Sequence, residues 1–247
     1  MVVGSGSPVT VVAHGMGAST AETRPLLSGV AGTKVLYDAR GHGRSALPAG
    51  TFDYDVLGRD LEAVADEHGA TGALGVSMGA GAMLSLLARR PDRFARVVLV
   101  LPAAIDRPRT DEAVRRLSVL ADALDAGDAT SVEQAVLDEV PPDLREAPGV
   151  AAYVRARTAH LLASPGVAVA VRSLPSVTPV PDRSARAAVT AEVLLLAQEG
   201  DPLHPAQVAR ELSAVLPRAR LVVFDRPGMA LRERTRIREL VPAALLG

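Results

Sequence analysis

Cysteine is absent from the 247 residues of the sequence, and aromatic side chains are almost as scarce. The first absence excludes disulfide bonds, thiolate metal centres and a cysteine nucleophile. The aromatics amount to three Phe, three Tyr and no Trp, which disfavours a stacking platform for single-stranded nucleic acid. Because 48% of the residues are hydrophobic, the core must consist mainly of Ala, Val and Leu. The length suits one domain, or one domain with an inserted subdomain.

An excess of either charge is also missing, since 27 basic residues face 28 acidic ones. This balance gives no electrostatic reason to expect nucleic acid or an anionic membrane as a partner. No apolar run reaches about 18 residues and no signal peptide is recognisable, so we expect a cytoplasmic protein. The partner we expect is a small-molecule substrate or ligand.

Metal and phosphate motifs are missing as well. The sequence has no His-Glu-x-x-His pattern and no close group of histidines, so we expect no metal site. Its one lysine, Lys34, is not preceded by the glycine of a phosphate-binding loop. We therefore predict that the protein has no cofactor.

Short apolar segments alternate with helical patterns over much of the chain. Such alternation predicts an α/β fold, with a mostly parallel sheet flanked by helices on both faces. The predicted strands are residues 9–13, 34–38, 71–76, 96–101, 192–197 and 220–224. The predicted helices between them begin at Ser19 or span residues 54–68, 78–90, 205–216 and 230–246.

The middle of the chain has a different pattern, because no strong strand occurs between residues 102 and 190. Helical stretches cover about 110–124, 131–140 and 150–163, with proline-containing breaks between them. We therefore predict a core formed by residues 1–102 and 190–247, and a helical cap formed by residues 103–189.

The strongest chemical motif is Gly75-Val76-Ser77-Met78-Gly79, between a predicted strand and a predicted helix. A serine on such a sharp turn is held exposed above the sheet, and the flanking glycines relieve crowding. The following helix directs its N-terminus at any oxyanion formed there. Ser77 is therefore the candidate nucleophile.

Two further loops follow predicted strands, where active sites of parallel sheets form. In His14-Gly15-Met16-Gly17, small residues let backbone N–H groups face an incoming oxygen, so Met16 and Met78 are predicted to form an oxyanion hole. His14 itself is interpreted as structural. In the loop 200–205, Asp201 either orients a base or caps the next helix.

Together these motifs resemble the α/β-hydrolase superfamily. The resemblance covers nearly the whole chain and includes His14-Gly15, the loop 38–45, the Ser77 motif and Asp201, in the order typical of the family. It implies an eight-stranded, mostly parallel sheet with a helical cap inserted after the sixth strand. It also implies that Ser77 is the nucleophile, Asp201 the triad acid, and the Met16 and Met78 N–H groups the oxyanion hole.

The sequence departs from the family in two places. It begins almost at the family's third strand, so the N-terminal strands are shortened or missing, and the exposed sheet edge favours a homodimer. The family's catalytic histidine follows the last strand, but here that segment contains Met229, and no histidine occurs after His204. The triad is therefore predicted to be incomplete unless His204, His160 or His14 replaces the missing base.

Three functions remain open. The first is an atypical hydrolase of a small ester, lactone or thioester, acting through Ser77 and the backbone oxyanion hole. The second is a non-hydrolytic member of the same fold, either a small-molecule binder or a cofactor-free lyase or isomerase. The third, a dinucleotide-binding protein, would use the segment 15–20 and Asp38, but Thr20 replaces the third glycine of that fingerprint.

Overall fold

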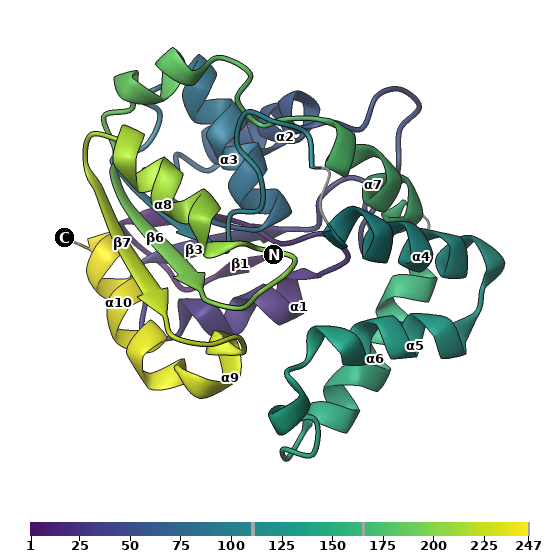
Figure 1. Ribbon diagram of the computed structural model, residues 1–247. Helices are drawn as coiled ribbons and strands as arrows, with labels where there is room; N and C mark the ends of the chain where they lie inside the picture. Colours follow the sequence, from purple (N-terminus) through teal and green to yellow (C-terminus); the bar gives the residue numbers. More distant parts are fainter. Residues whose placement is uncertain (110–111, 165, 247) are drawn as a thin grey trace.

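The central element is a mixed β-sheet with strand order β1-β3-β2-β4-β5-β6-β7 (Figure 1). The computed structural model describes residues 1–109, 112–164 and 166–246, and these contain all seven strands. Only β1 pairs antiparallel; the other neighbours are parallel. The strands are β1 (Val2–Val3), β2 (Val9–Ala13), β3 (Thr33–Tyr37), β4 (Gly72–Val76), β5 (Arg96–Val100), β6 (Glu192–Gln198) and β7 (Ala219–Phe224).

All six predicted strands are present, with ends that differ by at most one residue. The described residues contain seven strands where the resemblance implies eight, because only the two-residue β1 precedes β2. If β2 is counted as the family's third strand, β5 is the sixth. The helical insertion follows β5, as the resemblance implies.

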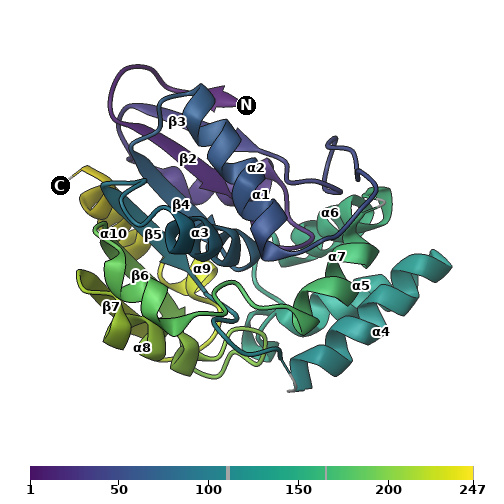
Figure 2. The ribbon, with the colours of Figure 1, turned by 90° about the horizontal axis from the view of Figure 1, so that it is seen from above.

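Apolar residues alternate between the two faces of the sheet and form two separate clusters. On one face, strand residues such as Leu99 and Leu195 pack with α2 (Tyr54–Glu67), α3 (Met78–Arg89) and α8 (Ala206–Val215). On the other, Val98 and Leu196 pack with α10 (Arg234–Leu246). Figure 1 shows these helices on opposite sides of the sheet, and Figure 2 looks down on the side that carries α2, α3 and α8. The predicted layer order is therefore confirmed.

Four helices lie between β5 and β6 and stand beside the carboxyl ends of the strands (Figure 1). They share their own apolar cluster, into which Met16 of the core also packs. Residues 110 and 111, where the first predicted helix of this region begins, lie outside the described residues. The helices are α4 (Glu112–Ala126), α5 (Ala129–Glu139), α6 (Val150–Ala163) and α7 (Val167–Ser173).

Short 3-10 turns complete the fold: η1 (Arg24–Leu27), η2 (Pro142–Leu144), η3 (Leu174–Ser176) and η4 (Arg183–Ala188). The helix predicted from Ser19 is only one α turn, α1 (Thr20–Thr23), and η1 follows from Arg24, with Pro25 as its second residue. Proline lacks the N–H group that a continuing helix would need. The predicted last helix is divided at Glu233 into α9 (Met229–Arg232) and α10. Val180 and Val189 pack in the same apolar cluster as Leu99 and Leu195 of the sheet. Both residues precede residue 190, where we predicted that the chain returns to the core.

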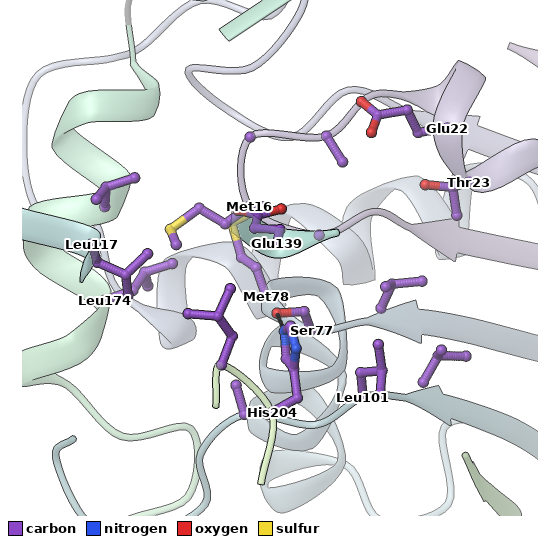
Figure 3. A pocket seen from close by; sticks show the side chains of 18 of the residues that line it. Met16, Glu22, Thr23, Ser77, Met78, Leu101, Leu117, Glu139, Leu174 and His204 are labelled. Atoms are coloured by element: carbon purple, nitrogen blue, oxygen red, sulfur yellow. Dashed lines mark hydrogen bonds between the residues drawn. The ribbon is translucent and has the colours of Figure 1, made fainter. Parts of the chain in front are cut away.

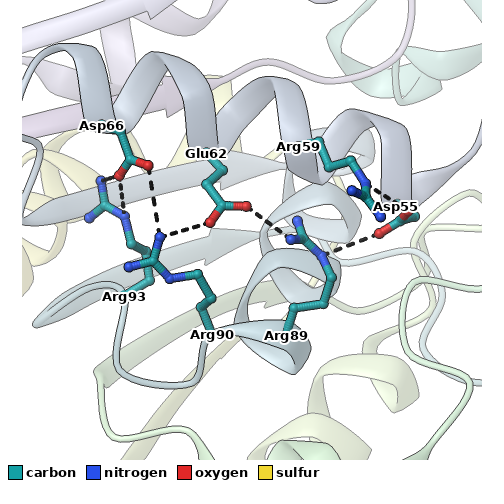
Figure 4. Close-up of polar contacts among 7 residues, drawn as sticks. All are labelled: Asp55, Arg59, Glu62, Asp66, Arg89, Arg90 and Arg93. Atoms are coloured by element: carbon teal, nitrogen blue, oxygen red, sulfur yellow. Dashed lines mark hydrogen bonds and ion pairs between the residues drawn. The ribbon is translucent and has the colours of Figure 1, made fainter.

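An ion-pair network joins the outer faces of α2 and α3 (Figure 4). Glu62 of α2 accepts from both Arg89 and Arg90, at 2.9 and 2.8 Å. Partly exposed pairs of this kind contribute little individually, and salt screens them. The network nevertheless ties α2 to α3, the helix that follows Ser77. Its members are Asp55, Arg59, Glu62, Asp66, Arg89, Arg90 and Arg93.

No helix in the described part of the chain is long and apolar enough to cross a membrane.

Leu195 provides a test of the core. It is fully buried on β6, between β5 and β7. We expect Leu195→Ala to lower the free energy of unfolding by about 3 kcal/mol, because it removes buried methyl groups and leaves a cavity. Urea denaturation measures this loss. The matched Leu231→Ala, at a side chain that is 47% exposed, should change stability by less than about 0.5 kcal/mol. Equal effects at both positions would contradict the described packing.

Candidate active site

Ser77 occupies a strained turn between β4 and α3. Its φ of 48° and ψ of −105° lie in a region that non-glycine residues rarely adopt. The turn is tight on both sides: a Cβ added to Gly75 would lie 2.5 Å from the Gly79 oxygen, and one added to Gly79 would lie 2.3 Å from the Ala13 oxygen. Glycine at both positions therefore allows the turn, which holds Ser77 half-buried at the edge of a cavity.

His204 lies between Ser77 and Asp201, and Figure 3 shows it beside Ser77. Its Nε2 is 2.9 Å from the Ser77 Oγ, and its Nδ1 is 3.0 Å from Asp201 Oδ2. Because a carboxylate can only accept, Nδ1 carries the proton that is donated to Asp201, and Nε2 can then accept the hydroxyl proton of Ser77. This is the hydrogen-bond order of a Ser-His-Asp triad. The sequence leaves open whether His204, His160 or His14 replaces the missing base, and His204, on the same loop as Asp201, is the one with these contacts.

Asp201 accepts four hydrogen bonds. Its Oδ1 accepts from the backbone N–H groups of Leu203 and His204, at 2.9 and 3.1 Å. Its Oδ2 accepts from His204 Nδ1 and, at 2.7 Å, from the side-chain amide of Gln198. Burial raises the pKa of Asp201, but the hydrogen bonds and charge of His204 and the Gln198 amide outweigh it and hold the pKa well below its usual range. Asp201 is thus ionised and fixed in orientation at neutral pH.

The loop after β2 lies directly against the Ser77 turn. The Gly79 N–H donates to the His14 carbonyl at 3.1 Å, which links the two loops. Met16 and Met78 both line the cavity beside Ser77 (Figure 3). Met78 is the first residue of α3, where a backbone N–H has no partner within the helix. Among the non-ladder hydrogen bonds of the described residues, neither the Met16 nor the Met78 N–H has an acceptor.

The other two candidate bases contact backbone groups. His14 is buried; its Nε2 accepts from the Ala39 N–H at 2.9 Å, and its Nδ1 donates to the Gly15 carbonyl at 2.7 Å. His160 directs its Nε2 toward the Ala18 carbonyl, 3.3 Å away. Of the three histidines, His204 is therefore the one that contacts the Ser77 hydroxyl.

Met229 begins α9, directly after the loop that follows β7. Its side chain is 2% exposed and lines the cavity, and its N–H donates to the side-chain oxygen of Gln198 at 2.9 Å. Met229, at the position where the resemblance led us to expect a histidine, is thus packed into the site and offers no base.

The cavity has a volume of about 300 Å3 and lies between the sheet edge and the helical insertion. Its insertion side is apolar, with Leu117, Leu161 and Leu174 among its lining. One part is polar, since Arg157 donates to Glu22 at 2.8 Å. Within the described part of the chain, no three His, Asp or Glu side chains are grouped so that they could hold a metal ion.

Sequence reasoning missed Gln198 and Arg109. Arg109, after β5, donates from its guanidinium to the carbonyls of Pro202 and Leu203, so it contacts the backbone just before His204. A polar residue at the end of the apolar strand 192–197 was a signal for Gln198. Nothing in the sequence places Arg109 near position 204, which is distant in the chain.

Comparison with known proteins identifies the family of this fold. A family model described as the alpha/beta hydrolase fold matches residues 8–228, and the chain belongs to this family. The mostly parallel sheet with helices on both faces is the architecture of this family. A curated relative, RutD of Caulobacter segnis, is provisionally named a carbamate hydrolase; it is 35% identical over 102 residues, which span 39% of this chain and 38% of RutD.

Solved structures show the same fold over the whole chain. A hydrolase from Pseudomonas aeruginosa is 25% identical, with a TM-score of 0.78, over 100% of this chain and 93% of that one. The enol-lactonase from Burkholderia xenovorans is 21% identical, with a TM-score of 0.82, over 100% and 95%. An esterase from Exiguobacterium antarcticum is 20% identical, with a TM-score of 0.79, over 100% and 94%.

The buried His42 gives a prediction for how the stability of the protein depends on pH. It is fully buried, and its ring lies 5.2 Å from that of His14. Burial, and next the neighbouring His14, lower the pKa of His42 to about 4. An unfolded histidine titrates near pH 6.5, so the stabilisation of neutral His42 is complete above about pH 6.5 and is lost as the pH falls toward 4.

We therefore expect the stability gap between the wild type and His42→Asn to narrow by up to about 3 kcal/mol between pH 7 and pH 4. Urea unfolding across this range measures the gap. The control His68→Asn, at an exposed position, should give a constant gap. A gap for His42→Asn that does not change with pH would contradict the burial of a neutral imidazole.

Proposed function

We propose that this protein hydrolyses a small carboxylic ester, lactone or thioester through an acyl-enzyme on Ser77. The observation that carries the proposal is the position of His204, in hydrogen-bond contact with both the Ser77 hydroxyl and the Asp201 carboxylate. A serine hydroxyl is a weak nucleophile without an adjacent base. His204 supplies that base from the loop after β6.

In the proposed reaction, His204 Nε2 takes the hydroxyl proton while Ser77 Oγ attacks the carbonyl carbon. The Met16 and Met78 N–H groups stabilise the oxyanion. His204 then gives the proton to the departing oxygen or sulfur as the bond to the acyl carbon breaks. A water molecule, deprotonated by His204, attacks the acyl-enzyme, and the proton returns to Ser77 as the acid leaves. Asp201 stays ionised and stabilises the imidazolium.

The cavity favours a small substrate with an apolar portion. Its volume of about 300 Å3 is at the lower end of the range for ligand pockets. The leucines from the insertion would contact the apolar portion. Carbamates contain an acyl carbon open to the same attack, and the provisional name of RutD makes them a class to include in a substrate screen.

The non-hydrolytic alternative depends on the absence of a base for Ser77. The contact between His204 and Ser77 favours hydrolysis over that alternative. The dinucleotide-binding alternative requires Asp38 to bind a ribose. Its carboxylate instead accepts backbone hydrogen bonds from Thr20 of α1 and from Arg44, at 3.4 and 3.5 Å.

Steady-state hydrolysis of 4-nitrophenyl acetate and butyrate tests the proposal. We expect Ser77→Ala and His204→Ala each to lower kcat/KM by about 1,000-fold or more, because residues of one triad act as a unit. Asp201→Asn should also lower it strongly, since the correct tautomer of His204 is no longer favoured.

His68→Ala is the matched control, because His68 is exposed at the end of α2 and should leave the rate unchanged. Full activity of His204→Ala would place the base elsewhere. A folded wild type that cleaves no ester, lactone, thioester or carbamate would favour a non-hydrolytic role.

A further inference from the structure

Gln198 connects two loops of the site. It is the last residue of β6 and only 6% exposed. Its side-chain Nε2 donates to Asp201 Oδ2 at 2.7 Å, and its Oε1 accepts from the Met229 N–H at 2.9 Å. Because a carboxylate only accepts and a backbone N–H only donates, these two partners fix which way the amide is oriented.

The oxygen that Gln198 contacts is the one that His204 uses. Asp201 Oδ2 accepts from both the Gln198 amide and His204 Nδ1. The two backbone N–H groups on Oδ1 fix the other side of the carboxylate. Without Gln198, the His204 ring would be the single donor to Oδ2. No second hydrogen bond would then fix the position of this oxygen beside the imidazole.

The segment after β7, at the start of α9, fixes Gln198 through the hydrogen bond from the Met229 N–H. Gly228, with a φ of 92°, precedes Met229 and lets α9 begin with its first N–H directed at the Gln198 oxygen. The unbroken chain of contacts is Ser77, His204, Asp201, Gln198 and the Met229 backbone.

We propose that Gln198 is a positioning residue that fixes Asp201 toward His204 and is itself held by the Met229 N–H. The loop after β7, which carries the base in the family pattern, would then support the acid instead. This inference rests on the proposed function, because it assigns Gln198 a role in the triad that the function requires.

Two variants separate positioning from simple packing. Gln198→Met keeps the length of the side chain but removes both hydrogen bonds. Gln198→Glu keeps the shape but places a second carboxylate beside Asp201, and like charges at this distance disfavour joint ionisation. The charged groups on and around these loops are Asp201, His204, Arg109, the Glu199–Arg210 pair, Asp225 and Arg226.

We expect Gln198→Met to lower kcat for 4-nitrophenyl butyrate by about 10- to 100-fold with little change in KM, as for other outer-shell residues that orient a functional group. Gln198→Glu should lower kcat as well. It should also move the acidic limb of the kcat/KM profile upward by about one pH unit, because a pair of carboxyl groups loses its second proton at a higher pH than Asp201 alone does. The control Gln207→Glu makes the same chemical change on the exposed face of α8 and should do neither.

Wild-type kcat and an unmoved acidic limb in folded Gln198→Glu would overturn the inference. If the wild type hydrolyses esters and loses activity in His204→Ala, such a result rejects the role of Gln198 alone. If the wild type is inactive, the proposed function itself fails first.

Nuclear magnetic resonance gives a second test that does not depend on a Gln198 variant folding well. The Gln198 side-chain amide of the wild type should exchange slowly with solvent, and its resonance should shift in Asp201→Asn. A fast-exchanging amide, or one unaffected by Asp201→Asn, would also overturn the inference.

Discussion

The contact between His204 and Ser77 depends on the parallel register of β4, β5 and β6. These strands end at one edge of the sheet, and backbone bonds beyond the ladder continue the alignment: Ser77 N–H donates to the Val100 carbonyl, and Leu101 N–H to the Leu196 carbonyl. The Ser77 turn, which follows β4, and the loop after β6 therefore leave the same edge of the sheet with one strand, β5, between them. The 2.9 Å separation of Oγ and Nε2 follows from this alignment together with a loop long enough to reach across β5.

Asp201 and His204, the proposed acid and base, share a single turn. The backbone N–H of His204 donates to one oxygen of Asp201 while its ring donates to the other. A displacement of the turn would therefore move both residues together, and their mutual orientation would be kept. The family pattern instead takes the base from the loop after the last strand, where this chain has the buried Met229. In our proposal, that loop instead supports the Asp201 carboxylate, because the Met229 N–H holds Gln198 and Gln198 donates to Asp201.

The layers of the fold and the Ser77 turn were predictable, because they depend on local signals. Apolar runs such as residues 96–101 identify buried strands, and the glycines at 75 and 79 identify a close approach. The choice among His204, His160 and His14 was not predictable, since it depends on how loops far apart in sequence meet. Gln198 was missed for the same reason: its two partners, Asp201 and Met229, come from different loops.

Covalent labelling by a fluorophosphonate, with mass detection of the modified peptide, tests most directly whether His204 activates Ser77. The account predicts a single adduct on Ser77 in the wild type, at a rate that falls by orders of magnitude in His204→Ala and hardly changes in His68→Ala. Labelling of Ser77 at the wild-type rate in His204→Ala would contradict it, as would a folded wild type that does not react.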